Sequence, residues 1–389
     1  MNHFHSKPAS VLKALLDKAQ NGCGLSPAEM RWLMSLKTPD ELEALFAAAR
    51  WLRQRHFGQK IFLYGFLYVS THCRNHCTFC LYRRGNPEAP RYRKSRDEIV
   101  ALASKLARTG VHLIDLTMGE DPALYGGGEK GFEDLHGTLE AVIEATGLPV
   151  MASVGVVPSA VLDRFARQGV SWYACYQETH SRSLFARLRG GQNYDDRLQG
   201  KRKAHELGLL FEEGLLTGVG ETREDLLKSL TAMQQLDADQ VRVMTFVPQK
   251  GTPMAAVSSP DPLQELKMIA LMRICMPDRL IPASLDIDGL AGLRQRLNAG
   301  ANVVTSLVPS GEGLAGVAQS ELDIEAGGRS IVGIQSVLDA CGLSPATPAQ
   351  YRQWIHQRQQ VVERRVLDKN CQMNAKHKRQ KETRSWQFI

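Results

Sequence analysis

The chain has 389 residues, of which 43% are hydrophobic and 23% are charged, and this composition excludes a disordered or fibrous protein. Its eight cysteines lack the regular spacing of a small secreted disulfide-bonded protein. The first residues contain no apolar segment typical of a signal peptide, and no apolar run is long enough to span a membrane. We therefore expect a cytoplasmic protein that makes no membrane contact.

The formal net charge of +7 is concentrated at the C-terminal end of the chain. Residues 351–389 hold ten Lys or Arg and three Asp or Glu, so the rest of the chain is formally neutral. A basic segment such as 376–381 can attract nucleic acid or an acidic partner. We favour the simpler interpretation of a solvated, partly disordered terminus.

Residues 8–56 have helical periodicity, with the pattern of a capping box at 26–29. After this segment, apolar runs that favour strands alternate with helical patterns. We expect strands at 61–70, 111–118, 149–155, 171–178, 209–217, 240–247, 280–287 and 301–308. We expect helices near 95–109, 132–146, 158–168, 192–207, 222–236, 262–275, 289–299 and 327–341.

Eight strand–helix units in sequence predict an α/β protein with a (β/α)8 TIM-type barrel, whose active site lies at the C-terminal ends of the strands. We expect an N-terminal helical extension over 1–56, the barrel over 57–345, and a C-terminal helix with a basic tail over 346–389. A doubly wound open sheet is the alternative.

Three cysteines, Cys73, Cys77 and Cys80, follow the first expected strand at spacings of four and three. Thiolates are soft ligands that select iron–sulfur clusters, zinc or Cu(I). Three thiolates leave one iron of a [4Fe–4S] cluster without a protein ligand, and chemistry needs such an open position. The alternatives are zinc, with His72 or His76 as a fourth ligand, and disulfide pairing. A cluster is favoured because the chain has no second Cys-x2-Cys unit.

The Cys-x3-Cys-x2-Cys motif, with an aromatic residue before its last cysteine, resembles the signature of the radical S-adenosylmethionine (SAM) superfamily. In that superfamily SAM chelates the open iron. One electron from the cluster then cleaves SAM and produces a 5′-deoxyadenosyl radical. After the second strand, Met118-Gly119-Glu120 resembles the Gly-Gly-Glu motif that receives the methionine ammonium. A plain turn is the alternative for this segment.

The end of the fourth strand, with Glu178 and the Arg-Leu-Arg-Gly-Gly segment after it, resembles the biotin synthase and hydrogenase-maturase group. This resemblance implies that Glu178 and Arg197, with Arg189 as the second choice, bind the ribose and carboxylate of SAM. Ser153 and Tyr82 are also assigned to the cofactor site. Either arginine is a surface charge in the alternative interpretation. The strand at 209–217 has no cysteine for a second cluster, so sulfur insertion is not expected.

Polar residues within apolar strands indicate a receptor for an amino acid. Arg242 suits a carboxylate, while Ser284 and Asp286 lie two residues apart on one strand face and suit an ammonium group. An Arg242–Asp286 ion pair is the rival interpretation. Asp115 either binds a substrate ammonium or is a satisfied structural group. Glu212 or Glu213, facing inward, would be another cation contact.

Four segments together resemble the methylornithine synthase (PylB) family of pyrrolysine biosynthesis. They are residues 64–80, 114–122, 241–249 and 312–318, within a resemblance that spans about 61–345. The last of them belongs to a glycine-rich loop at 309–319, which is either a lid over the adenosine or a flexible connector.

This resemblance implies the conversion of L-lysine to 3-methylornithine by fragmentation and recombination of a lysyl radical. It implies a [4Fe–4S] cluster, SAM and a one-electron donor such as flavodoxin or ferredoxin. Arg242 would hold the lysine carboxylate, Asp286 with Ser284 the α-ammonium, and Asp115 the side-chain ammonium.

Two rival functions are kept at this point. One is another radical SAM enzyme of the biotin synthase and hydrogenase-maturase group that acts on a different small amino acid. The other is a zinc-bound RNA-interacting protein that uses the basic tail. Nucleic-acid binding is not expected, because the sequence lacks the aromatic motifs of RNA-binding sheets.

Overall fold

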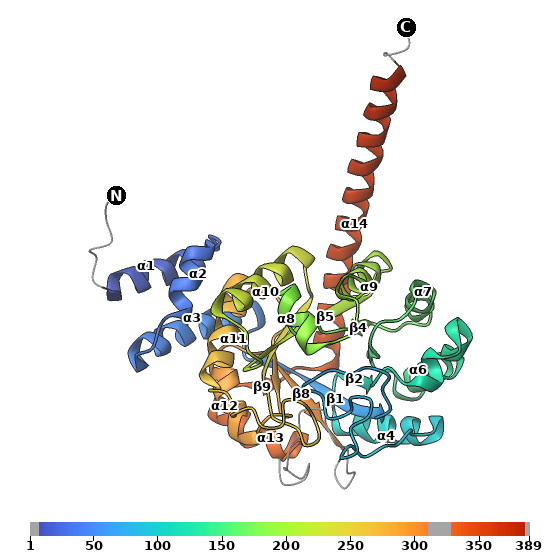
Figure 1. Ribbon diagram of the computed structural model, residues 1–389. Coiled ribbons are helices and arrows are strands. Elements are labelled where there is room, and N and C mark those ends of the chain that lie inside the picture. Colours follow the sequence, from blue (N-terminus) through green and yellow to red (C-terminus); the bar gives the residue numbers. More distant parts are fainter. Residues whose placement is uncertain (1–7, 310–327, 386–389) are drawn as a thin grey trace.

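The computed structural model describes residues 8–309 and 328–385. Three helices form the N-terminal part: α1 (Pro8–Gln20), α2 (Pro27–Met34) and α3 (Pro39–Phe57). The capping box expected at Ser26 is confirmed, and Thr38 caps α3 in the same way, each with proline at the start of the helix. These helices pack on the outer wall of the barrel against α10 (Arg223–Leu236) and α11 (Leu263–Cys275) (Figure 1).

The predicted parallel strands are confirmed, within a few residues at each end. They are β1 (Lys60–Ser70), β2 (Leu113–Met118), β3 (Val150–Ser153), β4 (Trp172–Ala174), β5 (Leu210–Thr217), β6 (Gln240–Thr245), β7 (Pro282–Ser284) and β8 (Val303–Leu307). The hydrogen-bonded order is β6-β5-β4-β3-β2-β1-β8-β7.

The two ends of this strand order meet, which makes the sheet a barrel. Gln240 on β6 and Leu280 before β7 form a parallel bridge, and the N–H of Val241 donates to Leu280 O (3.0 Å). The bridge lies at the N-terminal end of β6. Strands β6 and β7 are therefore joined at the end of the barrel where the strands begin, which we call the bottom. The barrel prediction is confirmed, and the doubly wound alternative is wrong.

The expected helices between the strands are also present around the barrel (Figure 1). Besides α10 and α11, they are α4 (Arg96–Thr109), α6 (Glu133–Thr146), α7 (Ser159–Arg167), α9 (Tyr194–Glu206), α12 (Leu290–Asn298) and α13 (Ile331–Ala340). Three short helices were not expected: α5 (Pro122–Tyr125), η1 (Gly128–Phe132) and α8 (Arg182–Leu188). They lie in the connections after β2 and β4, at the end of the barrel where an active site is expected.

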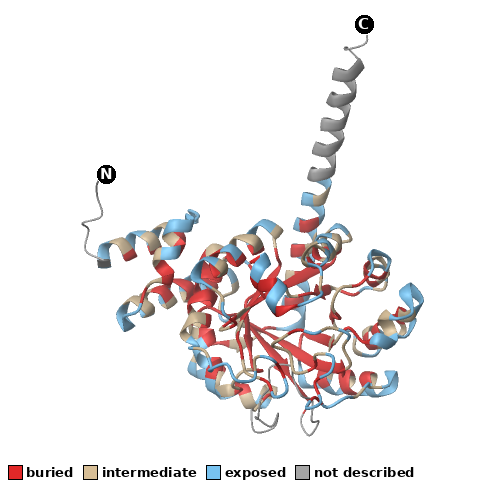
Figure 2. Cartoon of the chain, in the orientation of Figure 1, coloured by how far each residue is buried: buried red, intermediate tan, exposed pale blue. Residues whose placement is uncertain are grey.

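The bottom of the barrel is filled by apolar side chains and closed by the C-terminal helix α14 (Pro348–Ser385). Tyr351 of α14 is fully buried, and its hydroxyl donates to the hydroxyl of Tyr64 on β1 (2.7 Å). The ring of Trp354 stacks on that of Trp172 of β4, with 5.9 Å between the ring centres. Figure 2 shows the buried interior of the barrel continuing into the start of this helix.

The prediction of a solvated terminus from residue 351 is therefore wrong for the first turns of α14. Its physical reason is the helical spacing of apolar residues at Tyr351, Ile355 and Val362, all of which are buried. Arg358 on the same face donates from Nε to Asp239 Oδ1 (2.5 Å) beside β6.

Two expectations fall outside what the structure describes. The glycine-rich loop lies beyond residue 309, in the part that is not described, and the side chains of the basic segment 376–381 are not described either. Within the described helices, none combines the length and the apolar character needed to cross a bilayer.

Candidate active site

The cysteine-bearing loop leaves the C-terminal end of β1 and is anchored on the turn after β2. The N–H of Gly119 donates to Ser70 O (3.1 Å). A Cβ atom on Gly119 would lie 2.4 Å from His72 O and 2.7 Å from Cys73 Cβ, so this approach requires glycine. The Met-Gly-Glu turn at 118–120 therefore sets the position of the loop that carries the cysteines.

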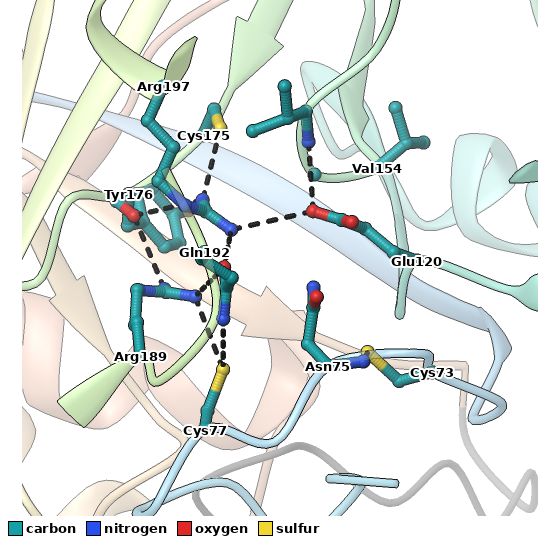
Figure 3. Close-up of polar contacts among 12 residues, drawn as sticks. Cys73, Asn75, Cys77, Glu120, Val154, Cys175, Tyr176, Arg189, Gln192 and Arg197 are labelled. Carbon is teal, nitrogen blue, oxygen red and sulfur yellow. Dashed lines mark hydrogen bonds and ion pairs between the residues drawn. The ribbon is translucent and has the colours of Figure 1, made fainter. Parts of the chain in front are cut away.

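The three cysteines of this loop are free thiols, so the disulfide alternative is wrong. Sγ of Cys77 accepts hydrogen bonds from Nε2 of Gln192 (3.0 Å) and Nη1 of Arg189 (3.5 Å) (Figure 3). Burial raises the pKa of Cys73 and of Cys80, and the neighbouring thiols raise that of Cys80 further. Soft sulfur donors with N–H groups directed at one sulfur fit an iron–sulfur cluster, because a positive metal centre holds thiolates ionised.

The geometry does not support the zinc alternative. In the described part of the chain, no three His, Cys, Asp or Glu side chains are grouped so that they could hold a metal ion. His72 and His76, the expected fourth ligands of zinc, are therefore not grouped with the cysteines around one point. A [4Fe–4S] cluster makes a different demand, because each cysteine binds a separate iron atom.

Glu120 lies in a buried polar network beside the cysteine loop (Figure 3). Its carboxylate accepts from Nε of Arg74 (2.9 Å) and from the N–H of Val156 (3.1 Å), and it lies 3.5 Å from Nη2 of Arg197. Arg197 also donates to Oε1 of Gln192 (2.7 Å), and its buried Nε has no partner among the described residues. Gln192 thus links Arg197 to the Cys77 sulfur.

Glu178 and Arg189 form a buried ion pair next to the same sulfur. Nη2 of Arg189 donates to Oε1 of Glu178 (2.6 Å), and its guanidinium lies 5.3 Å from the ring centre of Phe79. Glu178 has a φ of 64°, a conformation that non-glycine residues seldom adopt. Burial raises the pKa of Glu178, and the positive charge of Arg189 opposes this shift. Both arginines assigned to SAM are buried beside Cys77, so they are not surface charges.

Asp115 is a buried carboxylate inside the barrel with no ion-pair partner among the described residues. It accepts only from two hydroxyls, those of Ser153 (2.7 Å) and Thr117 (3.0 Å). Burial raises the pKa of Asp115 to about 7, and the Ser153 hydrogen bond opposes the shift. Ser153, which was expected to contact the cofactor, is therefore hydrogen-bonded to Asp115, a candidate residue for binding the substrate.

Arg242 points from β6 into the barrel and pairs with Glu212 of β5. Its Nε donates to Oε1 of Glu212 (2.6 Å), and its Nη1 donates to Oγ1 of Thr305 (3.1 Å) on β8. The hydroxyl of Tyr176 donates to the other oxygen of Glu212 (2.8 Å). The rival Arg242–Asp286 ion pair is wrong, because a carboxylate on the adjacent strand lies closer. The second terminal nitrogen of Arg242, Nη2, makes no hydrogen bond to any described residue.

Asp286 follows β7 and is paired with an arginine that the sequence did not indicate. It accepts from Nη1 of Arg329 (2.8 Å), from Oγ of Ser306 (2.7 Å) and from Oγ of Ser284 (3.3 Å). Ser284 and Asp286, which were expected on one strand face, are thus in contact, although Asp286 lies beyond the end of β7. Burial raises the pKa of Tyr82, and the nearby charge of Asp286 adds to this shift.

Several residues of the site were missed. Gln192 and Arg329 each follow a glycine pair, which indicates a turn but does not indicate what the next side chain contacts. Of the two neighbouring glutamates on β5, Glu212 faces the barrel interior, while Glu213 faces α9 and pairs with Lys201. Strand alternation predicts that only one of them points inward, but it does not predict which one.

Comparisons with known proteins identify the family and the fold of this chain. The family description "Radical SAM superfamily" matches residues 67–233. The 3-methylornithine synthase of Methanosarcina acetivorans is 43% identical over 335 residues, which are 86% of this chain and 94% of that protein. A crystal structure of methylornithine synthase (PylB) has 41% sequence identity and a TM-score of 0.83, and the match covers 87% of this chain and 99% of that one. The [FeFe] hydrogenase maturase subunit HydE of Thermotoga maritima is 31% identical, over 67% of this chain and 74% of its own.

Proposed function

Because this chain belongs to the methylornithine synthase family of the radical SAM superfamily, we propose that it converts L-lysine into 3-methylornithine, the first step of pyrrolysine biosynthesis. The family uses a [4Fe–4S] cluster and SAM, which together supply a carbon radical that removes a hydrogen atom from the substrate. A low-potential one-electron donor such as flavodoxin or ferredoxin completes the proposed system.

Cys73, Cys77 and Cys80 are the proposed ligands of the cluster. The N–H donors of Arg189 and Gln192 stabilise the Cys77 thiolate, as hydrogen bonds to cluster sulfurs do in general. Close packing of Gly119 against the loop keeps the three thiols at one end of the barrel.

The proposed SAM site is the polar network around Glu120, Glu178, Arg189 and Arg197. The carboxylate of Glu120 already has donors from Arg74 and Val156, so its role is to fix the turn after β2. We assign the methionine ammonium to the main chain of Met118 and Gly119 in that turn, where carbonyl oxygens accept from a cation. The buried, unpartnered Nε of Arg197 is a donor available to the cofactor.

The observation that carries the substrate assignment is Asp115, a buried carboxylate that has only hydroxyl partners among the described residues. An unpaired buried carboxylate is costly, and a cationic ligand removes that cost. The side-chain ammonium of lysine is such a cation. We propose that the carboxylate of lysine binds the free Nη2 of Arg242, and that the α-ammonium binds Asp286 and Ser284.

Anchoring lysine by its charged groups suits a reaction that breaks and remakes the carbon skeleton. Both fragments stay bound by their own ionic contacts, so they recombine in a fixed orientation. The apolar layer below Asp115, which is closed by Tyr351 of α14, keeps water from entering from the bottom of the barrel. These residues position the substrate, and none of them needs to transfer a proton.

The test is anaerobic incubation of the reconstituted protein with SAM, dithionite and uniformly carbon-13-labelled L-lysine, followed by NMR. The proposal predicts a new methyl signal in a product with the mass of lysine. The variant Asp115→Asn keeps the shape of the side chain but cannot hold a cation by charge. It should still bind the cluster, but it should form little of the methyl-bearing product. Cleavage of SAM without a new methyl signal would remove lysine as the substrate and favour another member of the biotin synthase and hydrogenase-maturase group.

A further inference from the structure

The segment that follows the cysteine loop is unusually basic. Residues 74–96 contain seven Lys or Arg and one Glu, whereas residues 1–350, which include this segment, are formally neutral. The segment connects β1 to α4 and lies at the C-terminal end of the barrel, where the proposed cluster is held. Its charge is therefore placed beside the proposed redox centre.

Three of these seven cations are balanced by carboxylates. Arg74 pairs with Glu120 at 2.9 Å and Arg93 pairs with Asp121 at 2.7 Å, while Arg96 lies 3.7 Å from Asp134. The first two pairs hold the cysteine loop and its flank onto the turn after β2. The positive charges of Arg74 and Arg93 are therefore neutralised by carboxylates of the protein itself.

The other four cations have no carboxylate partner among the described residues, and we call them the basic loop surface. Arg83 and Arg91 donate to main-chain carbonyls, Lys94 lies over an aromatic ring, and the side chain of Arg84 makes no described contact. Arg84 and Arg91 are exposed, and Arg83 and Lys94 are partly exposed. This connection therefore carries four positive charges, two exposed and two partly exposed, that no carboxylate of the described residues balances.

The basic loop surface is attached directly to the cysteine loop. The N–H of Arg84 donates to Asn75 O (2.7 Å), and Nε of Arg83 donates to Cys77 O (3.1 Å). Asn75 lies between the first two cysteines, and Cys77 is the second of them. A carrier bound to Arg83 and Arg84 would therefore meet the cluster through one short layer of protein.

We propose that the basic loop surface docks an acidic one-electron carrier protein whose redox centre is a low-potential flavin or iron–sulfur centre. This proposal rests on the function proposed above. In the step, the carrier is oxidised by one electron and the cluster is reduced by one electron, and no proton or bond is exchanged. Opposite charges steer such partners together and are screened by salt.

The test compares a protein donor with a small one in the full-length, cluster-loaded protein. The rate of SAM cleavage to 5′-deoxyadenosine is measured with reduced flavodoxin and, separately, with dithionite, at low and high salt. Arg84→Glu is the main variant, because its side chain has no described contact to lose. Arg108→Glu is the control, because Arg108 is also exposed but lies at the other end of α4, about 18 Å along that helix from Arg96.

The expected result is a flavodoxin-driven rate that falls with salt and drops about tenfold in Arg84→Glu, with the dithionite-driven rate unchanged. Arg108→Glu should match the parent protein with both donors. The proposal is overturned if Arg84→Glu and the double variant Arg84→Glu/Lys94→Glu both keep the flavodoxin-driven rate, or if both donors are affected equally. It is also overturned if a 20-nucleotide RNA binds the surface at physiological salt and flavodoxin does not. Because SAM cleavage is scored without lysine, failure of the lysine assay would leave this result independent.

Discussion

At the scale of single residues, the proposed chemistry depends on two carboxylates, Asp115 and Asp286, whose surroundings in the barrel differ. Asp115 and Asp286 are both buried, yet only Asp286 has an arginine beside it. Asp115 is therefore the group whose ionisation should respond to a bound cation. Its pKa of about 7 places that response in an accessible pH range.

We predict that lysine binding tightens about tenfold between pH 6 and pH 8, because the ionised fraction of a carboxyl with a pKa of about 7 rises by that factor. The sign follows from the raised pKa: below 7 the carboxyl is protonated and offers a cation no charge. Calorimetric titration of the SAM-loaded protein with lysine measures the effect. Asp115→Asn should bind weakly with little pH dependence.

A second variant separates charge from simple loss of shape. The Ser153 hydrogen bond lowers the pKa of Asp115, so Ser153→Ala should raise that pKa and move the binding transition to higher pH. If Asp115→Asn kept the same pH dependence as the parent protein, the assignment of Asp115 to the lysine ammonium would be abandoned.

At the scale of elements, two loops that follow neighbouring strands fit together through a single glycine. We predict that Gly119→Ala loses most of its cluster, because the new Cβ would overlap the main chain at His72, and overpacking of this kind costs about 1–3 kcal/mol. The iron content and the visible absorbance of the reconstituted protein measure how much cluster is bound. Gly24→Ala, where a Cβ meets nothing within 4 Å, is the matched control. Full iron content in Gly119→Ala would show that the loop adapts.

The start of α14 acts as the floor of the barrel. Tyr351 is fully buried, bonds to Tyr64 and lies 5.0 Å from the ring of Phe62, measured between ring centres. We predict that Tyr351→Ala lowers the free energy of unfolding by about 3–5 kcal/mol and Tyr351→Phe by about 1 kcal/mol. Urea denaturation measures both.

The control for α14 is Val361→Ala on the same helix, where the side chain is 37% exposed and the expected change is within about 0.5 kcal/mol. A similar small change in Tyr351→Ala would mean that the barrel is stable without this floor.

At the scale of the whole molecule, the alternation of apolar strands and helices was sufficient to predict the barrel and the end that holds the site. Position within an apolar strand indicated Asp115 and Arg242 as candidates, and both are buried in the structure, but the sequence left open whether Asp115 faces the cavity. The partners of these charges were not predictable. Arg242 pairs with Glu212 and Asp286 with Arg329, and both choices depend on side-chain reach across a closed barrel. Sequence spacing does not encode that reach.

The C-terminal helix shows a second limit of the sequence. Tyr351, Ile355 and Val362 have helical spacing and are buried, but the basic composition of the segment obscured this pattern. Charged residues dominate the mean hydropathy of the segment, whereas burial depends on one face of the helix. The short helix α8 was missed for a different reason, since its seven residues are too few to show a clear helical period.

The measurement that tests the central claim most directly is deuterium transfer from fully deuterated L-lysine. The protein is incubated without oxygen with unlabelled SAM and dithionite, and SAM and 5′-deoxyadenosine are analysed by mass spectrometry. The account predicts deuterium in both compounds and a methyl-bearing isomer of lysine, with all three signals reduced in Asp115→Asn. Unlabelled 5′-deoxyadenosine beside unchanged lysine would contradict it, because lysine would then not be held within reach of the radical.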